Sequence, residues 1–497
     1  MYTFADKTIH AKPGQFTMEL TYSAVGKEIP SLKDEQSVFY PIELFYPSSV
    51  LDSFREIVRQ SNLCDQKYNN PYTGEEEQFP SNHNEFTARH LQLLARNERS
   101  NVSGQINFQL YGNLLSEDHI TRIRCLVKGT VIVGKVTATH MKGFRIPLEA
   151  FSHPEEVIII DQAGLQWQGD LRNTGGMFFY PSASESAQLP ADYNVWQNDM
   201  YLHMYGKERP AVAGVGMDVE WGLSLDSDVR IAGTLDLDGV VLGIKTEFQQ
   251  ALSGVVNYSK VLPWDSKPVN FKFLKAGMGF FCAGLYDPIT KYPLVGLQSD
   301  GLAKLQLARL EGILAALQEY PKGTDFGTVK RLSLPFSAEI PGGADSKLRD
   351  QYSMRLNEIR DQCERLGLIW GGAQEEDSLN PVSGYMNALT NCADPHAQIG
   401  NEGGYSSVDA AIASNIPLIH RMNPAYNHFI FCSENKPLAK SDELSIVGSS
   451  TSSRHYGQTG GSDLFAATAG SREQIKSGEK ENKKKNDDDE NSMCTIS

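Results

Sequence analysis

The sequence NALTNCADPHAQIGNEGGYSSVDAAI, residues 387–412, predicts a strand, a glycine-containing loop and the start of a helix in direct succession. The strand ends in small polar residues around Asn391, and the helix is expected to begin at Ser406 or Ser407. Through the glycine pair at 403–404, the chain would direct backbone N–H groups and a helix dipole at one spot. Such an arrangement suits a diphosphate.

Three acidic residues, Asp394, Glu402 and Asp409, lie at the joints of this stretch and would surround a group bound there. Each has an alternative role. Asp394 could form an Asx turn before Pro395, Asp409 could be a first-turn acid favoured by the helix dipole, and Glu402 could be a solvated loop residue. Because all three alternatives would have to hold together, the cluster is more informative than its members.

Composition indicates a folded protein of more than one unit. A chain of 497 residues exceeds one ordinary core, and roughly 100 to 200 residues per domain predicts two or three units. Hydrophobic residues make up 40% and charged residues 22%, near globular averages. The net charge of -15 argues against a nucleic-acid partner, which requires a basic face. Seven scattered cysteines without a CxxC pair argue against a disulfide framework or a zinc site.

The two ends of the chain bear on localisation. The N-terminus carries no basic segment followed by an apolar one, and no apolar run reaches the roughly eighteen residues of a membrane span. At the other end, Cys494-Thr-Ile-Ser497 matches the C-a-a-X pattern, in which the cysteine is prenylated and a final Ser favours farnesyl. A chance match is the alternative. One prenyl chain binds membranes only marginally, so a farnesylated Cys494 would need a second signal for stable anchoring.

Composition and pattern divide the chain into four regions. They are a mixed, partly helical region at 1–100, a β-rich domain at 101–265, a layered α/β domain at 266–436 and a disordered tail at 437–497. In the β-rich domain, β-branched residues punctuated by glycine predict strands at 129–139, 157–160 and 229–241. Its tryptophans are expected to fill a core or a sheet face: Trp167, Trp196 and Trp221.

Helices and short apolar runs alternate between residues 268 and 435. The patterns predict helices over 302–320 and 346–366, and strands over 329–336 and 368–370. Such alternation is typical of an α/β fold with parallel neighbouring strands, in which ligands bind beyond the carboxyl ends of the strands. We therefore expect the glycine loop of the opening stretch to lie at that edge of a sheet.

Three segments, Thr390-Asn-Cys-Ala-Asp-Pro395, Gly403-Gly404 and Val408-Asp-Ala-Ala-Ile412, together resemble the ADP-ribose-binding signature of macrodomains. In that family, a strand ending in Asn-Ala-Ala-Asn-Pro leads to a glycine-rich loop and then to Val-Asp-x-Ala-Ile at a helix start. The chain departs from this pattern in three ways: Asp394 replaces the second Asn, Glu402 precedes the glycines, and Tyr405 with two serines occupies a region usually richer in glycine.

The segment Phe271-Lys-Phe-Leu-Lys-Ala-Gly-Met-Gly-Phe-Phe281 and the farnesylation-like tail are similar to the MavL-like group of Legionella effectors. The C-terminal half of these proteins carries an atypical macrodomain. The resemblance implies a hydrolase that removes ADP-ribose from modified proteins, with arginine-linked ADP-ribose on ubiquitin as one target class. It also implies delivery to a host cytosol by a non-classical route.

The resemblance assigns roles by position. Asn391 and Asp394 would hold the distal ribose, while Glu402 and Asp409 would shape the loop or activate the attacking water. The catalytic candidates are thus Asp394, Glu402 and Asp409, and the residues that would contact ADP-ribose are Asn391, Gly403, Gly404, Tyr405, Gly277 and Gly279. The last two glycines could equally form a plain bulge, because a lone Gly-x-Gly is weak evidence.

The chemistry of the acids agrees with a glycosidic hydrolase. Cleavage of an N-glycosidic bond to ribose passes through an oxocarbenium-like state, in which one carboxylate activates water and a second stabilises positive charge or protonates the leaving group. Three carboxylates would also repel a diphosphate, so the helix N-terminus, the loop amides or a divalent cation would have to offset their charge. We name no cofactor or metal, and the part of a cation stays open.

A further glycine segment, Gly371-Gly-Ala-Gln-Glu-Glu-Asp377, resembles in composition the glycine and Gln-Glu-Glu signature of poly-ADP-ribose glycohydrolases. Its spacing is wrong, because that family places several residues between the glycines and the acids. A solvated loop after the strand at 368–370 is therefore the favoured interpretation.

Two alternative functions come from other classes. A non-catalytic module would bind ADP-ribose without cleaving it and would dock a protein partner on the β-rich region. A nucleotide-sugar glycosyltransferase is the other alternative, because residues 402–419 also resemble the donor-nucleotide loop and helix of two-domain sugar transferases. The chain lacks their Glu-Ala helix start and their N-terminal Rossmann half.

Overall fold

The computed structural model describes residues 42–69, 76–95, 131–136, 157–162, 174–189, 193–223, 229–260, 267–274, 284–294, 300–335, 344–374, 382–391 and 430–435, with shorter pieces at 2–4, 7–9, 23–24, 27–28, 114–116, 118–119, 122–123, 126, 164–165, 167, 171, 282, 337–338, 340 and 437–438. The chain divides into two compact units, residues 1–11 with 450–497, and residues 12–449. In the first unit, β1 (Tyr2–Phe4) pairs with β2 (Lys7–Ile9) in antiparallel fashion. All other described elements belong to the second unit.

The second unit contains an eight-stranded sheet. Its strands, in spatial order, are β16 (Ile369–Trp370), β15 (Val329–Ser333), β13 (Val269–Lys272), β17 (Met386–Asn391), β9 (Val157–Gln162), β8 (Val131–Val136), β5 (Ile42–Pro47) and β18 (Ile430–Asn435). Neighbours pair in parallel except at β8, which is antiparallel to both β9 and β5. The regions delimited in the sequence at residues 100 and 265 thus contribute strands to one sheet.

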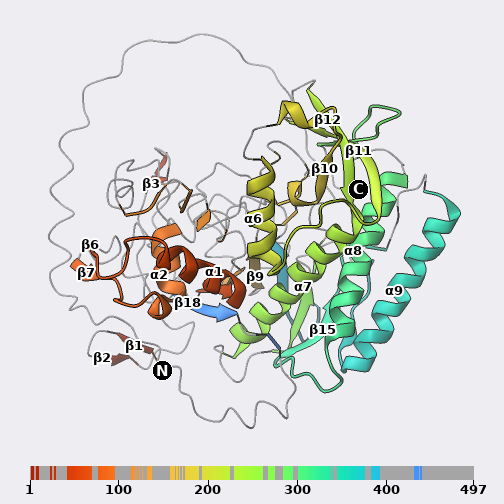
Figure 1. Cartoon of the computed structure of the whole chain (residues 1–497). Helices are drawn as coiled ribbons and strands as arrows, with labels where there is room; N and C mark the ends of the chain where they lie inside the picture. The colour runs from red at the N-terminus through yellow and green to blue at the C-terminus, as the bar shows by residue number, and fades with distance from the viewer. Residues whose placement is uncertain are drawn as a thin grey trace. The chain divides into compact units, whose positions relative to one another are not determined.

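Three long helices pack in succession on one face of this sheet: α7 (Leu237–Ser259) contacts α8 (Asp300–Glu319), and α8 contacts α9 (Ser346–Leu366) (Figure 1). Phe248 of α7 meets Phe271 and Phe273, with ring centroids 5.6 and 5.1 Å apart. Because α8 connects β13 to β15 and α9 connects β15 to β16, this part of the chain has the alternation of helices and parallel strands predicted from the sequence.

Local signals set the bounds of α9. The side chain of Asp345 accepts a hydrogen bond from the Lys347 N–H at 3.1 Å, which caps the first turn. Gly367 ends the helix with φ of 75°, a left-handed conformation that glycine adopts without a Cβ penalty. The helix predicted over 346–366 is confirmed, as are the strands that precede and follow it.

The other helices and ribbons of the second unit whose bounds the structure describes are short. They are α1 (Ser48–Arg59), α2 (Ala88–Ala95), α6 (Tyr193–Tyr205), the 3-10 turns η1 (His83–Glu85), η4 (Gly176–Phe178) and η5 (Ser186–Gln188), and the two-stranded ribbons of β3 (Ser23–Ala24) with β4 (Lys27–Glu28) and of β6 (Lys67–Asn69) with β7 (Glu76–Gln78). Helix α1, in the region predicted to be partly helical, buries Val50, Leu51 and Phe54.

A second, four-stranded antiparallel sheet has the order β10 (Phe179–Pro181), β12 (Arg230–Asp236), β11 (Gly216–Gly222) and β14 (Leu285–Tyr286). Its inner face is aromatic. The ring of Trp221 lies 6.4 Å from that of Trp167 and 5.5 Å from that of Phe179, and both tryptophans are fully buried. Trp196 packs half-buried at the margin of the same core, so these tryptophans belong to the core, as predicted.

Chain topology places the second sheet at the side of the eight-stranded sheet where the carboxyl ends of its parallel strands lie. We call this side the carboxyl edge. Strands β10, β11 and β12 lie in the connection from the carboxyl end of β9 to α7, and β14 lies in the connection from the carboxyl end of β13 to α8. Because β9 and β13 run parallel on either side of β17, both connections leave the same edge and flank the end of β17. In Figure 1, β10, β11 and β12 gather at one end of α7 and α8.

The strand predicted over 229–241 is wrong in its second half, because the strand β12 ends at Asp236 and α7 begins at Leu237. Gly239, one of the two glycines in the predicted strand, lies in α7 and serves helix packing, as does Gly254 further along the helix. A Cβ at Gly239 would lie 2.5 Å from Cδ1 of Phe178, and one at Gly254 would lie 3.2 Å from Cγ1 of Val131. A buried helix of Gly and β-branched residues therefore has the composition of a strand.

The fold class predicted from the sequence, α/β, is confirmed in its coarse form by the mixed sheet and its helices. Apart from Pro437 and Leu438, the tail predicted over 437–497 lies outside the described residues, and Cys494 with it. Within the described part of the chain, no helix combines the length and the apolar character required to cross a membrane.

Candidate functional site

Of the site residues predicted from the sequence, the described part of the chain includes one, Asn391, the last residue of β17. The others lie outside the described residues: Asp394, Glu402, Gly403, Gly404, Tyr405, Asp409, Gly277 and Gly279. The structure does describe the strands from which their loops leave. Asn391 pairs in register with Asp161 of β9, so the predicted loop begins at the carboxyl edge of a central strand.

Three of the glycine segments singled out in the sequence follow strands that end at this same edge. Leu274, after β13, precedes Gly277 by three positions; Gly371 and Gly372 directly follow β16; and the loop at 392–405 follows β17. Since β13, β16 and β17 all run in one direction in one sheet, their carboxyl ends share an edge. The edge also fits the position at which ligands bind in open α/β sheets.

Gly371 and Gly372 have a structural role at this edge. The Gly371 N–H donates to Leu332 O at 2.6 Å, and the Leu334 N–H donates to Gly372 O at 2.9 Å, so the pair extends the contact between β16 and β15. A Cβ at Gly371 would lie 2.0 Å from Ser333 Oγ and 2.8 Å from Leu332 O, which leaves no room for another residue. The solvated loop predicted here does not begin at Gly371, because the two glycines continue the pairing with β15, and residues 375–377 lie outside the described residues.

Four buried polar residues line one face of the sheet next to the edge, and we call them the polar cluster: Asn270, Lys272, Ser333 and Asn387. Asn270 Nδ2 donates to Asn387 Oδ1 at 3.4 Å, and Ser333 Oγ donates to Asn270 Oδ1 at 2.9 Å. Lys272 pairs in register with Ser333, two positions beyond Asn270. Side chains alternate along a strand, so this face is opposite the one that Phe271 presents to α7.

The polar cluster is costly for the fold. Strands of a parallel sheet are buried on both faces and are ordinarily apolar throughout, yet Lys272 is completely buried in a central strand. Polar residues kept in such a position, at the edge where α/β sheets bind ligands, are typical of a functional site.

The end of β13 is held firmly beside β17. The Leu274 N–H donates to Thr390 Oγ1 at 2.9 Å. Arg309 of α8, itself buried, donates from Nη2 to the carbonyl oxygens of Phe273 and Leu274 at 2.8 and 2.9 Å, and from Nη1 to Ser337 Oγ at 3.0 Å. Charge-assisted bonds of this kind fix the direction in which the chain leaves the sheet toward Gly277.

Two titratable groups near this edge stay protonated at neutral pH. Burial raises the pKa of Tyr352 to about 12, against the opposing charge of Arg309, and its hydroxyl donates to Ser337 O at 2.9 Å. Burial likewise raises the pKa of the Cys282 thiol to about 12. Cys282, in the connection that follows β13, is thus a poor nucleophile.

The sequence interpretation missed Asn270, Lys272 and Ser333. A signal was present, because Asn270-Phe-Lys-Phe273 alternates polar and apolar residues with the period of a strand. That alternation normally indicates one solvated face. The structure shows instead that the polar face is buried, which no local pattern indicates.

No protein-family model and no curated protein sequence matches this chain. Among the residues that the structure describes, no group of three or more His, Cys, Asp or Glu side chains is placed to hold a metal ion.

Proposed function

We propose that this chain is a hydrolase that releases ADP-ribose from modified protein, with arginine-linked ADP-ribose on ubiquitin as the substrate to test. The observation that carries the proposal is the parallel pairing of the central strands β13 and β17. Their carboxyl ends lie side by side, next to the polar cluster. The loops that contain Gly277 and the residues 394–409 follow these two strands directly.

The charges at this edge support an anionic ligand. Three carboxylates in the 394–409 segment would repel a diphosphate, and the sequence alone offered only loop amides, a helix dipole or a cation to offset them. Lys272 lies on β13, the strand next to β17, and a bound phosphate would be a further partner for its amino group.

In the proposed reaction, Asn391 and Asp394 hold the distal ribose, while Asp409 or Glu402 activates the water that attacks its anomeric carbon. The bond from that carbon to the guanidinium nitrogen breaks, and the arginine side chain leaves after protonation by a second carboxylate. Delivery to a host cytosol and a farnesyl group on Cys494 remain parts of this proposal that derive from the sequence.

The test is a measurement of ADP-ribose released from arginine-ADP-ribosylated ubiquitin. We expect release by the wild type and at least a hundredfold loss in both Asp394→Ala and Asp409→Ala, the range typical of a lost acid or base. Asp52→Ala, on the exposed face of α1, is the matched control and keeps full activity.

Other outcomes separate the alternatives. Tight binding of ADP-ribose by the wild type without any release would identify a non-catalytic binding module. Consumption of free nucleotide sugars, with transfer to an acceptor, would identify a glycosyltransferase. Loss of activity in the Asp52→Ala control would show that an Asp→Ala change lowers activity through misfolding. The losses in Asp394→Ala and Asp409→Ala would then not identify catalytic groups.

A further inference from the structure

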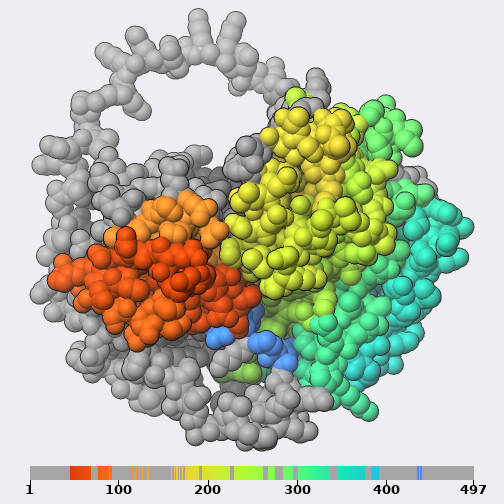
Figure 2. Space-filling model, in the orientation of Figure 1, coloured from red at the N-terminus to blue at the C-terminus, as the bar shows by residue number. Residues whose placement is uncertain are grey.

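Arg331 of β15 lies on the same face of the eight-stranded sheet as the polar cluster, and we call this the polar face. It pairs in register with Asn270 and precedes Ser333 by two positions, and side chains alternate along a strand. The polar face is opposite the one that α7 covers. In Figure 2, α8 and α9 form a continuous surface on the helix-covered side, so a ligand of Arg331 would approach from the other side of the sheet.

The polar face is accessible at its margin and buried further in. Ile369, the register partner of Arg331 on β16, is 51% exposed. Arg331 itself is partly exposed, whereas Asn270 and Ser333 are fully buried. Solvent therefore reaches this face from the β16 side, and Arg331 is located where the exposed part meets the buried part.

A β-bulge determines that Arg331 belongs to the polar face. The register of β13 with β15 shifts by one residue between Val269 and Asn270, so that Lys330 is the extra residue and Asn270 pairs with Arg331. Without the shift, Asn270 would have Lys330 opposite it, and Arg331 would turn to the helix-covered face. Bulges are rare in parallel pairs, and next to active sites they re-aim side chains.

The side chain of Arg331 extends toward the carboxyl edge and has unused donors. Its Nη2 donates to Gly371 O at 2.9 Å, although its register partner Ile369 lies two positions earlier on β16. A Cβ at residue 371 would lie 2.9 Å from Arg331 Nε, so glycine lets the main chain lie against the Nε and Nη2 side of the guanidinium. Nε is buried without a hydrogen-bond partner among the described residues, and Nη1 donates to none of them. The end of the guanidinium that carries Nη1 is therefore left for a ligand.

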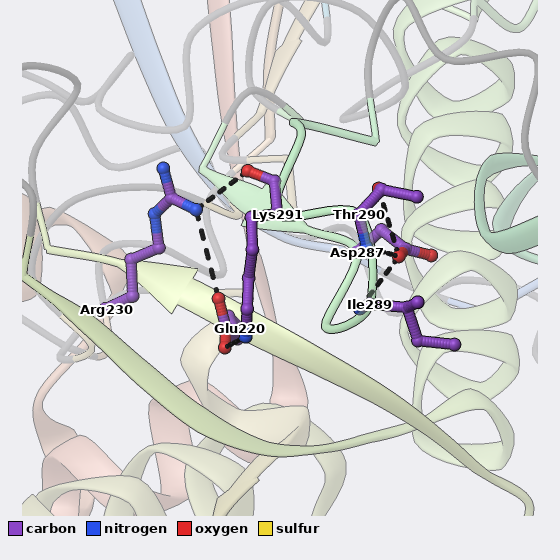
Figure 3. Close-up of polar contacts among 6 residues, drawn as sticks. All are labelled: Glu220, Arg230, Asp287, Ile289, Thr290 and Lys291. Carbon is purple, nitrogen blue, oxygen red and sulfur yellow. Dashed lines mark hydrogen bonds and ion pairs between the residues drawn. The ribbon is translucent and has the colours of Figure 1, made fainter.

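Most other arginines of the described residues have more partners. Ion pairs with Asp or Glu are formed by Arg55, Arg59, Arg122, Arg230, Arg355 and Arg360. In one of them, Arg230 Nη1 donates to Lys291 O at 2.8 Å and lies 3.9 Å from Glu220 Oε2 (Figure 3). Within the part of the chain that the structure describes, Arg331 has no carboxylate partner, so its positive charge can pair with a bound anion.

The strands around Arg331 favour an anion with more than one negative charge. β13, β15, β16 and β17 contain Lys272, Lys330 and Arg331 but no acidic residue. A guanidinium presents a planar fork that matches phosphate oxygens. Strands whose charged residues all have one sign attract a multiply charged anion more strongly than a singly charged one. A phosphate or diphosphate group therefore fits this place better than a carboxylate.

We propose that Arg331 binds a phosphate group at the carboxyl edge, through the donors that Gly371 leaves unused. The hydrogen bond to Gly371 O already orients the guanidinium, which lowers the entropy cost of binding. On the proposed function, on which this assignment rests, the phosphate belongs to the diphosphate of ADP-ribose. The phosphate site itself requires no hydrolysis.

Titration calorimetry with inorganic pyrophosphate, ADP-ribose and adenosine tests the site. In Arg331→Met, which keeps the apolar stem but removes the charge, we expect the Kd for both phosphate compounds to rise about tenfold or more, because a charge-assisted hydrogen bond is lost. The affinity for adenosine, which has no phosphate, stays at the wild-type value. Arg360→Met, on α9 with its side chain 45% exposed, is the matched control and changes none of the three affinities.

The results distinguish the phosphate site from the proposed function. A wild type that binds neither pyrophosphate nor ADP-ribose overturns the site, as do wild-type affinities in Arg331→Met or an equal loss in Arg360→Met. If both compounds bind through Arg331 but no ADP-ribose is released from modified protein, the phosphate site stands and the hydrolase is lost. A loss confined to pyrophosphate overturns the assignment of the site to ADP-ribose.

Arg331→Lys separates the loss of a contact from the loss of the fold. It keeps the positive charge and a long stem but lacks the planar fork. Its urea midpoint should equal that of the wild type, and its Kd for pyrophosphate should lie between those of the wild type and Arg331→Met. Should Arg331→Met not fold, this variant decides, because a wild-type Kd for pyrophosphate overturns the role of the guanidinium.

Discussion

At the scale of single residues, Lys272 is the most informative side chain of the described sheet. It is fully buried on β13, its register partner on β15 is Ser333, and Asn270 with its partner Asn387 lies two positions before it on the same face. Replacement of a buried ion by an apolar side chain of similar volume is often neutral or stabilising for folding. An experiment can therefore distinguish a lysine that binds a ligand from one that only stabilises the fold.

Lys272→Met should weaken ADP-ribose binding at least tenfold, because a charged hydrogen bond contributes roughly 1.5–3 kcal/mol. The affinity for adenosine, which has no phosphate, should not change. Titration calorimetry with both ligands measures this difference. Lys245→Met, at a lysine of α7 that is 23% exposed and pairs with Glu319, is the control and should bind both ligands as the wild type does. Equal ADP-ribose affinity in Lys272→Met would make Lys272 a structural residue.

At the scale of elements, the contact between α7 and α8 depends on one glycine. A Cβ at Gly312 of α8 would lie 2.8 Å from Val241 O and 2.8 Å from Cβ of Ile244, both on α7. Neither atom is at the end of a flexible side chain, so one helix would have to move. Since α7 and α8 cover the face of the sheet that Phe271 occupies, such a movement would reach the strands at the candidate site.

Gly312→Ala should lower the free energy of unfolding by about 1–3 kcal/mol, the usual cost of an overpacked contact. The higher helix propensity of alanine offsets at most about 1 kcal/mol of this loss. Urea unfolding measures the change. Gln318→Ala, at an exposed position of the same helix, is the control and should change stability by less than about 0.5 kcal/mol. A stabilised Gly312→Ala protein would show that the helices separate easily.

At the scale of the whole molecule, one buried histidine links stability to pH. His203 of α6 is nearly buried, and neither of its ring nitrogens has a hydrogen-bond partner among the described residues. Burial lowers the pKa of His203, with Asp199 opposing the shift and Arg122 adding to it. Arg122 and Asp199 form an ion pair at 3.4 Å, so their charges largely cancel at the imidazole.

The lowered pKa of His203 means that the unfolded chain takes up a proton first as the pH falls. Its contribution to stability is therefore complete above about pH 6.5, the usual value for histidine, and is lost progressively below it. His203→Leu should flatten the decrease in urea midpoint between pH 7 and pH 5. Parallel decreases in the variant and the wild type would show that other groups cause the acid sensitivity.

Much of the fold follows from local sequence. The bounds of α9 depend on Asp345 and Gly367, which are adjacent to the helix they cap. The strand β17 and the alternation of helices and strands after residue 268 follow from hydrophobic periods of two and 3.6 residues. The predicted loop at 392–405 also begins at the edge where the α/β pattern placed it.

The sequence alone thus determined the α/β class, the bounds of α9 and the strand that leads into the predicted site. The tertiary structure decided which strands are neighbours, that the glycine-rich segment at 237–259 is a helix, and that Lys272 is buried beside Asn270. Asn270 and Asn387 share a hydrogen bond although 117 positions separate them. Caps and periods act over a few residues, whereas strand pairing and burial depend on segments far apart in the chain, so only the folded protein reveals them.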